Sequence, residues 1–208
     1  SSKGSTPLRG MPLTAKMQAE IGDEDLDRCR GLLLGLAAGD RNGGPIQMAL
    51  VLAEHLAATS NYQPMEVFAG YAKWWDNGDG VDAWDTGPTA KDMLQAHVRK
   101  PCCSLRELEE RSSSLDKQLR GKTAGANAAH RVAPLALAGF VPDSALADCA
   151  RQESRLTHWS PISQASCAAL VSCLRRLLRG ESWQTSAALL LADASVDAVA
   201  AAAGQPAP

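Results

Sequence analysis

Several features that would place the chain in a particular class are missing from the sequence. No apolar run reaches the roughly 18 residues that a membrane-spanning helix needs, so we expect no membrane span. Basic and acidic residues nearly balance, at 21 and 23, and leave a formal net charge of −2. A nucleic-acid partner needs a concentrated basic surface, which this balance does not provide. The composition therefore predicts a soluble globular protein that does not bind nucleic acid.

Metal-binding patterns are also absent among the six cysteines. No CxxC pair and no histidine at zinc spacing accompany them. Four of the six fall in apolar helical patterns, where a free thiol behaves as a small hydrophobe. These four are Cys29, Cys149, Cys167 and Cys173. The cysteines predict an intracellular, reducing compartment, which is the cytoplasm or, if residues 1–22 are a processed targeting peptide, the mitochondrion or chloroplast.

The alternation of apolar and polar residues that is typical of strands does not occur either. Apolar residues instead recur at helical spacing between turn signals, which predicts an all-α fold in one domain. With 208 residues the chain can bury one good core. We expect a flexible arm at residues 1–22, a helical domain at residues 23–197 and a flexible tail at residues 198–208.

Aromatic residues are scarce, at 4% of the chain, yet several of them fall close together. A helix expected after Pro64 places Phe68, Tyr71, Trp74 and Trp75 on neighbouring turns. Aromatic side chains bury a large apolar area, so we interpret this group as part of the core. A stacking platform for a ligand is the alternative.

The most informative segment that is present covers residues 31–56. Two apolar helical runs, at residues 31–38 and 46–56, are joined by a polar elbow that reads GDRNGGP. A helix that is apolar nearly all round belongs inside a core, so both runs are expected there. The elbow would then bring Asp40 and Asn42 against buried walls. In the alternative interpretation, the glycines only end one helix and Pro45 starts the next.

Three further polar elbows follow, and each of them precedes a helix. They lie near Asp85, Asn127 and His158. If the four helix starts converge, their unpaired N–H groups and positive dipole ends would form a pocket for phosphate or pyrophosphate. The expected ligand is an anionic, nucleotide-like molecule. Ordinary links between helices, with a structural role for His158, are the alternative.

Local signals predict several helix ends. Ser104 and Glu107 form a capping box, and Ser160 and Ser182 stand where helix caps are expected. The densest basic group ends the long apolar helix that starts at Pro161. This group, which we expect on a solvated last turn, consists of Arg175, Arg176 and Arg179.

Five segments occur in an order that resembles the ADP-ribosylglycohydrolase family. Between about residues 29 and 180 they read GLLLGLAAGD, QMALVLAEHL, DTGPTA, AHRVAPLALAG and LTHWSP. Members of this family are all-α enzymes that remove ADP-ribose from modified side chains or related compounds. The resemblance implies a compact orthogonal helical bundle, which we expect to be incomplete at its C-terminus.

The family binds two divalent cations, usually magnesium or manganese, and the sequence departs from its metal motifs. Residues 44–47, which read GPIQ, stand in place of an Asp-Asp-Thr-Gln run and offer no carboxylate. The late Asp-x-Asp-Thr motif is missing, with only a faint likeness at residues 195–201. Hard cations need several oxygen ligands, so we expect a magnesium or manganese site at Asp40 and Asp85 that is weak or absent.

The elbows and the resemblance together assign roles to individual residues. Asp85 is the expected catalytic residue, which would orient or deprotonate a nucleophile. The residues expected to bind the ligand are Asp40, Asn42, Gly43, Thr86, Gly87, Gly125, Asn127 and His158.

Two functions are open at this point. The first is hydrolysis of an N- or O-glycosidic bond of ADP-ribose, or binding of an ADP-ribose-like nucleotide or an ADP-ribosylated protein. The second is a catalytically degenerate member of the family that serves as a structural or accessory subunit of a larger protein assembly. The resemblance alone supports only an analogy, because a fold can outlive its chemistry.

Overall fold

The computed structural model describes residues 23–40, 43–78 and 86–192, and every regular element in these ranges is a helix. The all-α prediction is thus confirmed for this part of the chain. In chain order the elements are α2 (Asp23–Gly39), α3 (Gly44–Thr59), α4 (Pro64–Asp76), α5 (Pro88–Arg99), α6 (Leu105–Gln118), α7 (Asn127–Arg131), the 3₁₀ helix η1 (Ala133–Leu137), α8 (Asp143–Arg155), α9 (Pro161–Leu178) and α10 (Trp183–Ala192).

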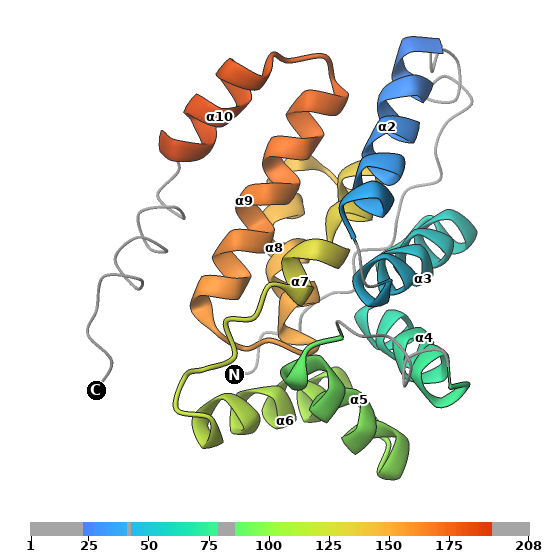
Figure 1. The fold of residues 1–208 in the computed structure, drawn as a ribbon, viewed down its shortest axis with the longest axis vertical. Coiled ribbons are helices and arrows are strands. Elements are labelled where there is room, and N and C mark those ends of the chain that lie inside the picture. The colour runs from blue at the N-terminus through green and yellow to red at the C-terminus, as the bar shows by residue number, and fades with distance from the viewer. Residues whose placement is uncertain (1–22, 41–42, 79–85, 193–208) are drawn as a thin grey trace, which may run out of the picture.

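The long helix α9 is the centre of the arrangement. It packs most extensively against α8 and also contacts η1, α10, α7 and α2. Figure 1 shows α2 and α10 on opposite sides of α9 at the top of the view, while α5 and α6 lie at the bottom. The short elements α7 and η1 therefore lie in the interior of the bundle, between α9 and α3.

A large part of the core lies where α3 packs against α4, α7 and η1. Met48 and Leu52 of α3 are fully buried, as expected for the apolar run at residues 46–56. The aromatic side chains of α4 are buried as well, in agreement with the core interpretation, and Phe68 and Tyr71 have no exposed surface. Helices α3 and α4 approach closely at Gly70, where a Cβ atom would lie 2.7 Å from Cγ1 of Val51.

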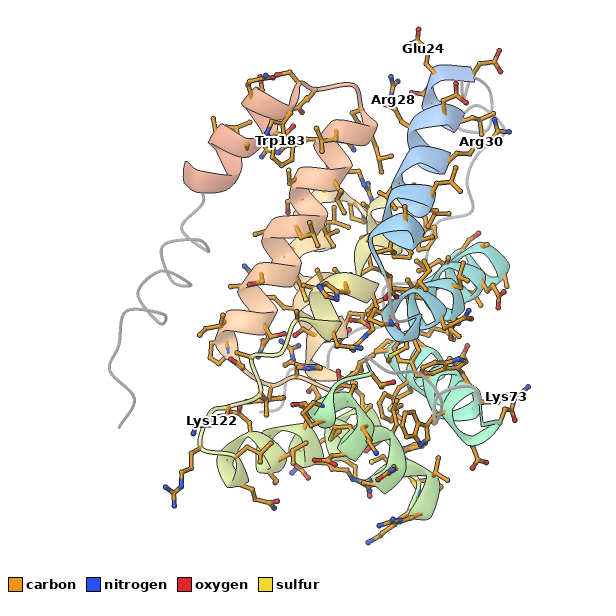
Figure 2. The ribbon with its side chains drawn as sticks, in the orientation of Figure 1. Glu24, Arg28, Arg30, Lys73, Lys122 and Trp183 are labelled. Atoms are coloured by element: carbon orange, nitrogen blue, oxygen red, sulfur yellow. The ribbon has the colours of Figure 1, made fainter. Side chains whose placement is uncertain are left out.

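Helix α2 differs from the prediction for its apolar run. None of its residues is buried, and Leu34 keeps 69% of its surface exposed. Leu32 packs against the core only in part. Arg28 adds a tether to α9, because its Nε donates a hydrogen bond to the carbonyl oxygen of Leu178 at 3.0 Å (Figure 2). The expectation of core burial is wrong for residues 31–38, because α9 and η1 cover only one side of the helix.

Arg175 also differs from its prediction, since its side chain is buried rather than solvated. Its guanidinium donates five hydrogen bonds of 2.7 to 3.3 Å. The acceptors are the carbonyl oxygens of Leu135, Ala136, Ala138 and Val141 and the carboxylate of Asp143. These carbonyls belong to η1 and the turn after it, where buried backbone oxygens need donors from elsewhere.

The predicted caps are present, with one difference. Ser104 Oγ accepts from the Glu107 N–H, and Ser182 Oγ accepts from the Thr185 N–H. Ser160 stands at the N-cap of α9, but its side chain makes no cap bond. In the described ranges no helix combines the length and apolarity that crossing a bilayer requires.

Candidate functional site

The first elbow is organised by Asp40, which follows α2. Its Oδ1 accepts from the Gly43 N–H at 3.1 Å, and its Oδ2 accepts from the Ile46 N–H at 2.7 Å. Gly43, at the N-cap of α3, has φ +83°, a conformation that favours glycine. Both carboxylate oxygens of Asp40 thus satisfy N–H groups at the start of α3. Asn42 lies outside the described residues.

The second elbow is described only from Thr86 onward. Thr86 is buried, and Gly87 is the N-cap of α5 with φ +71°. Pro88 follows at the first helical position, where its missing N–H costs nothing. Asp85, the expected catalytic residue, lies outside the described residues, so its role and the convergence of this elbow with the others stay predictions.

The third and fourth elbows are joined directly. Thr123, in the loop before α7, is fully buried, and its Oγ1 accepts from the Ser160 N–H at 3.1 Å. The same hydroxyl donates to the Asp116 carboxylate of α6. This contact fixes the loop after α6 to the start of α9 and brings Gly125 next to His158.

His158 lies beneath the loop at Gly125. Its side chain is 1% exposed, and a Cβ atom at Gly125 would lie 3.2 Å from its Nε2. Nδ1 shares a 2.7 Å hydrogen bond with Thr157 Oγ1. Burial, together with the positive charge of Arg131, lowers the pKa of His158 to about 3. The imidazole is therefore uncharged at neutral pH. A side chain at residue 125 would require the ring to shift by a few tenths of an ångström.

Asn127, the first residue of α7, is buried and only half satisfied. Its Oδ1 accepts a 2.6 Å hydrogen bond from Nη1 of Arg131, one helical turn further on. Its Nδ2 is buried and has no hydrogen-bond partner. Native structures leave few buried polar atoms unpaired, and those that remain unpaired often have a specific cause such as a binding role. The two residues before it, Gly125 and Ala126, are exposed, so this donor lies directly under the surface of the loop.

Arg131 is held from its other side by a buried acid. Its Nε donates to Glu153 Oε1 at 2.9 Å, and its Nη2 donates to the Glu153 carbonyl oxygen at 3.1 Å. Tyr71 Oη of α4 donates to the same Oε1 at 2.7 Å, and the guanidinium lies 5.2 Å from the Tyr71 ring centroid. We call Tyr71, Asn127, Arg131 and Glu153 the Arg131 cluster.

The charges in the Arg131 cluster compensate each other. Burial acts to lower the pKa of Arg131, but the Glu153 carboxylate outweighs it, and the pKa lies above its usual value. Burial and the Glu153 charge raise the pKa of Tyr71 well above its usual value. The cluster thus contains a charged Arg131 and a neutral Tyr71 at physiological pH. Oε2 of Glu153 is the second buried atom of the cluster without a partner.

The structure therefore unites only part of the predicted site. Gly125, Asn127 and His158 lie together around Arg131, whereas Asp40 and Gly43 lie at the start of α3, which packs against α7. Arg131 and Glu153 are not among the predicted site residues, and Tyr71 is predicted as part of the core, with a stacking platform as the alternative. The spacing of Asn127 and Arg131 by one helical turn is a signal that could have indicated their contact.

The described residues do not fit the two-cation site that the resemblance implies. Within residues 23–40, 43–78 and 86–192, no three histidine, cysteine, aspartate or glutamate side chains lie together as metal ligands. Asp40, the predicted ligand in this part of the chain, directs both oxygens at backbone N–H groups. The expected magnesium or manganese ion stays untested.

The fold and the cluster define an all-α protein with buried polar groups beneath the link from α6 to α7. The chain belongs to the ADP-ribosylglycohydrolase family, whose model matches residues 45–207. The match confirms the resemblance, and it includes the whole Arg131 cluster but begins after Asp40. No curated protein and no solved structure matched the chain.

Proposed function

We propose that this member of the ADP-ribosylglycohydrolase family binds an ADP-ribosyl group at the loop that precedes α7, with Asn127 as the central donor. The Nδ2 of Asn127 carries the proposal, because it is a buried donor without a partner in the segment that matches the family. ADP-ribose is rich in acceptors, with two phosphates, ribose hydroxyls and a purine. An amide N–H satisfied by such an acceptor would remove the cost of leaving it unpaired.

Binding at Asn127 includes a movement of the loop. Nδ2 is covered in the structure, and the exposed residues above it are Gly125 and Ala126. In this proposal a shift of these two residues lets a ligand reach the amide. His158 lies next to Gly125 and is uncharged at neutral pH, so the positive charge near the loop comes from Arg131.

Hydrolysis is the reaction that the family performs, and we assign its catalytic step in this chain to Asp85. A carboxylate there would orient or deprotonate the nucleophile that attacks the glycosidic carbon. The aspartate directly precedes buried Thr86 at the start of α5. Asp85 and residues 79–84 lie outside the described residues, so the proposal assigns no step to a metal ion. The proposed substrate is an ADP-ribosylated side chain or a related N- or O-glycoside of ADP-ribose.

Calorimetric titration of the full chain with ADP-ribose tests the proposal. We expect saturable binding, and titrations with and without magnesium or manganese separate two versions of it. Binding that requires the metal supports a metal-assisted hydrolase, whereas equal binding in both conditions supports recognition by protein groups alone. Failure to bind in either condition would overturn the proposal and favour the predicted accessory subunit.

An Asn127→Asp variant tests the donor itself. The new carboxylate keeps an oxygen for Arg131 but removes the N–H group, so ADP-ribose affinity should fall about tenfold or more, as for one lost hydrogen bond left unpaired. Asn61→Asp, which makes the same change in the link between α3 and α4, is the matched control and should leave affinity unchanged. Equal affinities of the wild type and Asn127→Asp would show that Asn127 does not contact the ligand.

A further inference from the structure

The hydrogen bonds of the Arg131 cluster form one continuous chain across three helices. Tyr71 of α4 donates to Glu153 of α8, Arg131 of α7 donates to the same carboxylate oxygen, and Arg131 also donates to Asn127. Tyr71, Arg131 and Glu153 have no exposed surface, and Asn127 is 6% exposed. The orientation of the Asn127 amide is therefore set by groups that a ligand does not reach.

We propose that Arg131 is a positioning residue for ligand binding, because its hydrogen bond to Oδ1 fixes the direction in which Asn127 presents Nδ2. This inference rests on the proposed binding of ADP-ribose by Asn127. The amide group is planar, so a donor that holds the oxygen also determines where the nitrogen points. Without that donor, the oxygen and nitrogen could exchange places and the ligand would meet an acceptor instead.

The pattern of satisfied and unsatisfied atoms distinguishes positioning from simple core stability. A buried ion pair between Arg131 and Glu153 needs no contact with Asn127, yet Nη1 makes its short 2.6 Å bond there. Asn127 Nδ2 has no partner beside this contact, and a purely structural network would pair it. Glu153 and Tyr71 meanwhile hold the guanidinium from the opposite side, so it cannot follow a rotating amide.

A double-mutant cycle on the full chain tests whether Arg131 acts through Asn127. ADP-ribose affinity is measured by calorimetry for the wild type, Arg131→Lys, Asn127→Ala and the double variant. We expect Arg131→Lys to weaken binding about tenfold in the wild type and less than about twofold in the Asn127→Ala background, because the group that it orients is then gone. The same loss in both backgrounds, or no loss in the wild type, would overturn the inference.

Two further variants serve as a matched control and as a replacement if Arg131→Lys does not fold. Arg175→Lys makes the same substitution at Arg175, which is also buried, and should leave the affinity within about twofold of the wild type. If Arg131→Lys does not fold, Tyr71→Phe replaces it, since this variant keeps the guanidinium and removes only the hydroxyl bond to Glu153. Its smaller loss of affinity should again disappear in the Asn127→Ala background, and a loss that persists there contradicts positioning.

A readout without ligand separates this inference from the proposed function. The two Nδ2 protons of Asn127 give a pair of NMR signals that the Asn127→Ala variant identifies by their loss. The two protons give separate signals in any primary amide, because rotation about the C–N bond is slow, and their chemical shifts depend on the groups around the amide. We therefore expect Arg131→Lys to shift or broaden both signals. Unchanged signals overturn the positioning role even if ADP-ribose binds. A changed pair in a chain that binds no ADP-ribose overturns the proposed function while the orienting contact itself is retained.

Discussion

Two arginines, Arg131 and Arg175, are buried in the described part of the chain, and they are stabilised in different ways. Arg175 donates all five of its hydrogen bonds to four backbone carbonyls and to Asp143, whose side chain is half exposed. Arg131 faces a fully buried carboxylate and an amide. Desolvation lowers the pKa of Arg175, whereas Glu153 raises that of Arg131 despite its burial.

The surroundings of the two arginines differ in whether buried polar atoms remain without a hydrogen-bond partner. Arg175 donates hydrogen bonds to the carbonyl oxygens of η1 and the following turn. None of its guanidinium nitrogens is among the unpaired buried atoms. The Arg131 cluster contains two unpaired buried atoms, Asn127 Nδ2 and Glu153 Oε2. A saturated arrangement contributes to stability, while an arrangement with spare hydrogen-bonding capacity is where a ligand can add contacts.

Loss of the Arg131 charge should have the largest effect. Arg131→Met leaves the Glu153 carboxylate buried without a counter-charge, and breaking a buried pair in this way costs about 3–5 kcal/mol. Urea denaturation of the variant measures the loss. Arg106→Met, which removes an exposed pair with Glu110, is the control and should leave stability nearly unchanged, because solvent screens an exposed ion pair. Equal effects of the two variants would contradict the role assigned to the buried pair.

Arg175→Lys should be the next most damaging substitution. A single ammonium group keeps the charge but cannot reach all four carbonyls, and an unsatisfied buried acceptor costs about 1–3 kcal/mol. Denaturation should show this loss while ADP-ribose affinity stays constant. A strong loss of ADP-ribose affinity without a loss of stability would show that Arg175 serves ligand binding and not stability, which contradicts the comparison with Arg131.

The pH dependence of stability probes the surroundings of Arg131. His158 has a pKa near 3 in the folded protein, below the value of about 6.5 for an unfolded histidine, so the unfolded state binds more protons between these values. Its contribution to stability is fully present above pH 6.5 and declines by about 1.4 kcal/mol per pH unit as the pH falls toward 3.

Denaturation curves recorded from pH 7 down to pH 4 check this slope by comparing the wild type with His158→Gln. The variant should lose the part of the acid destabilisation that comes from the histidine, whereas His130→Gln, at an exposed position of α7, serves as the matched control. Identical slopes for the wild type and His158→Gln would show that the ring charges without cost in the folded state.

The smallest effect is expected at Asp40, whose two carboxylate oxygens both accept hydrogen bonds, as the carbonyls around Arg175 do. Asp40→Ala removes the acceptors for Gly43 and Ile46, and loss of such a cap costs about 1 kcal/mol. Thermal unfolding measures it. The Asp40→Asn variant keeps an oxygen and should lose less, and a variant that instead abolishes ADP-ribose binding with normal stability would favour the predicted ligand role over capping.

Much of the fold could be predicted because its signals are local. The apolar spacing and the prolines defined α3, α4, α5 and α9, and the Ser104 cap defined the start of α6. The glycine-rich segment before Asn127 likewise indicated a loop beside a helix start. These signals depend on neighbours within one or two turns, which a single sequence shows directly.

The parts that could not be predicted depend on contacts between distant residues. Glu153 lies 22 residues from Arg131 and 82 from Tyr71, and within its own polar helix it looks like any surface acid. Arg175 has the same sequence context as a solvated helix end, and only the packing of η1 shows where it points. The exposure of α2 follows from which helices are available to cover it, and the 3.6-residue pattern does not contain that information.

The lack of burial in α2 has a consequence for local stability. A helix that withdraws only the partly buried Leu32 from the core when it separates from α9 and η1 opens at a low free energy. Its amide protons should therefore exchange with deuterated solvent by undocking of the whole helix, well before those of α3, where Met48 and Leu52 would have to leave the core. Residues 23–39 would then form a cooperative unit of their own, and the family-matched remainder could stay folded while they open.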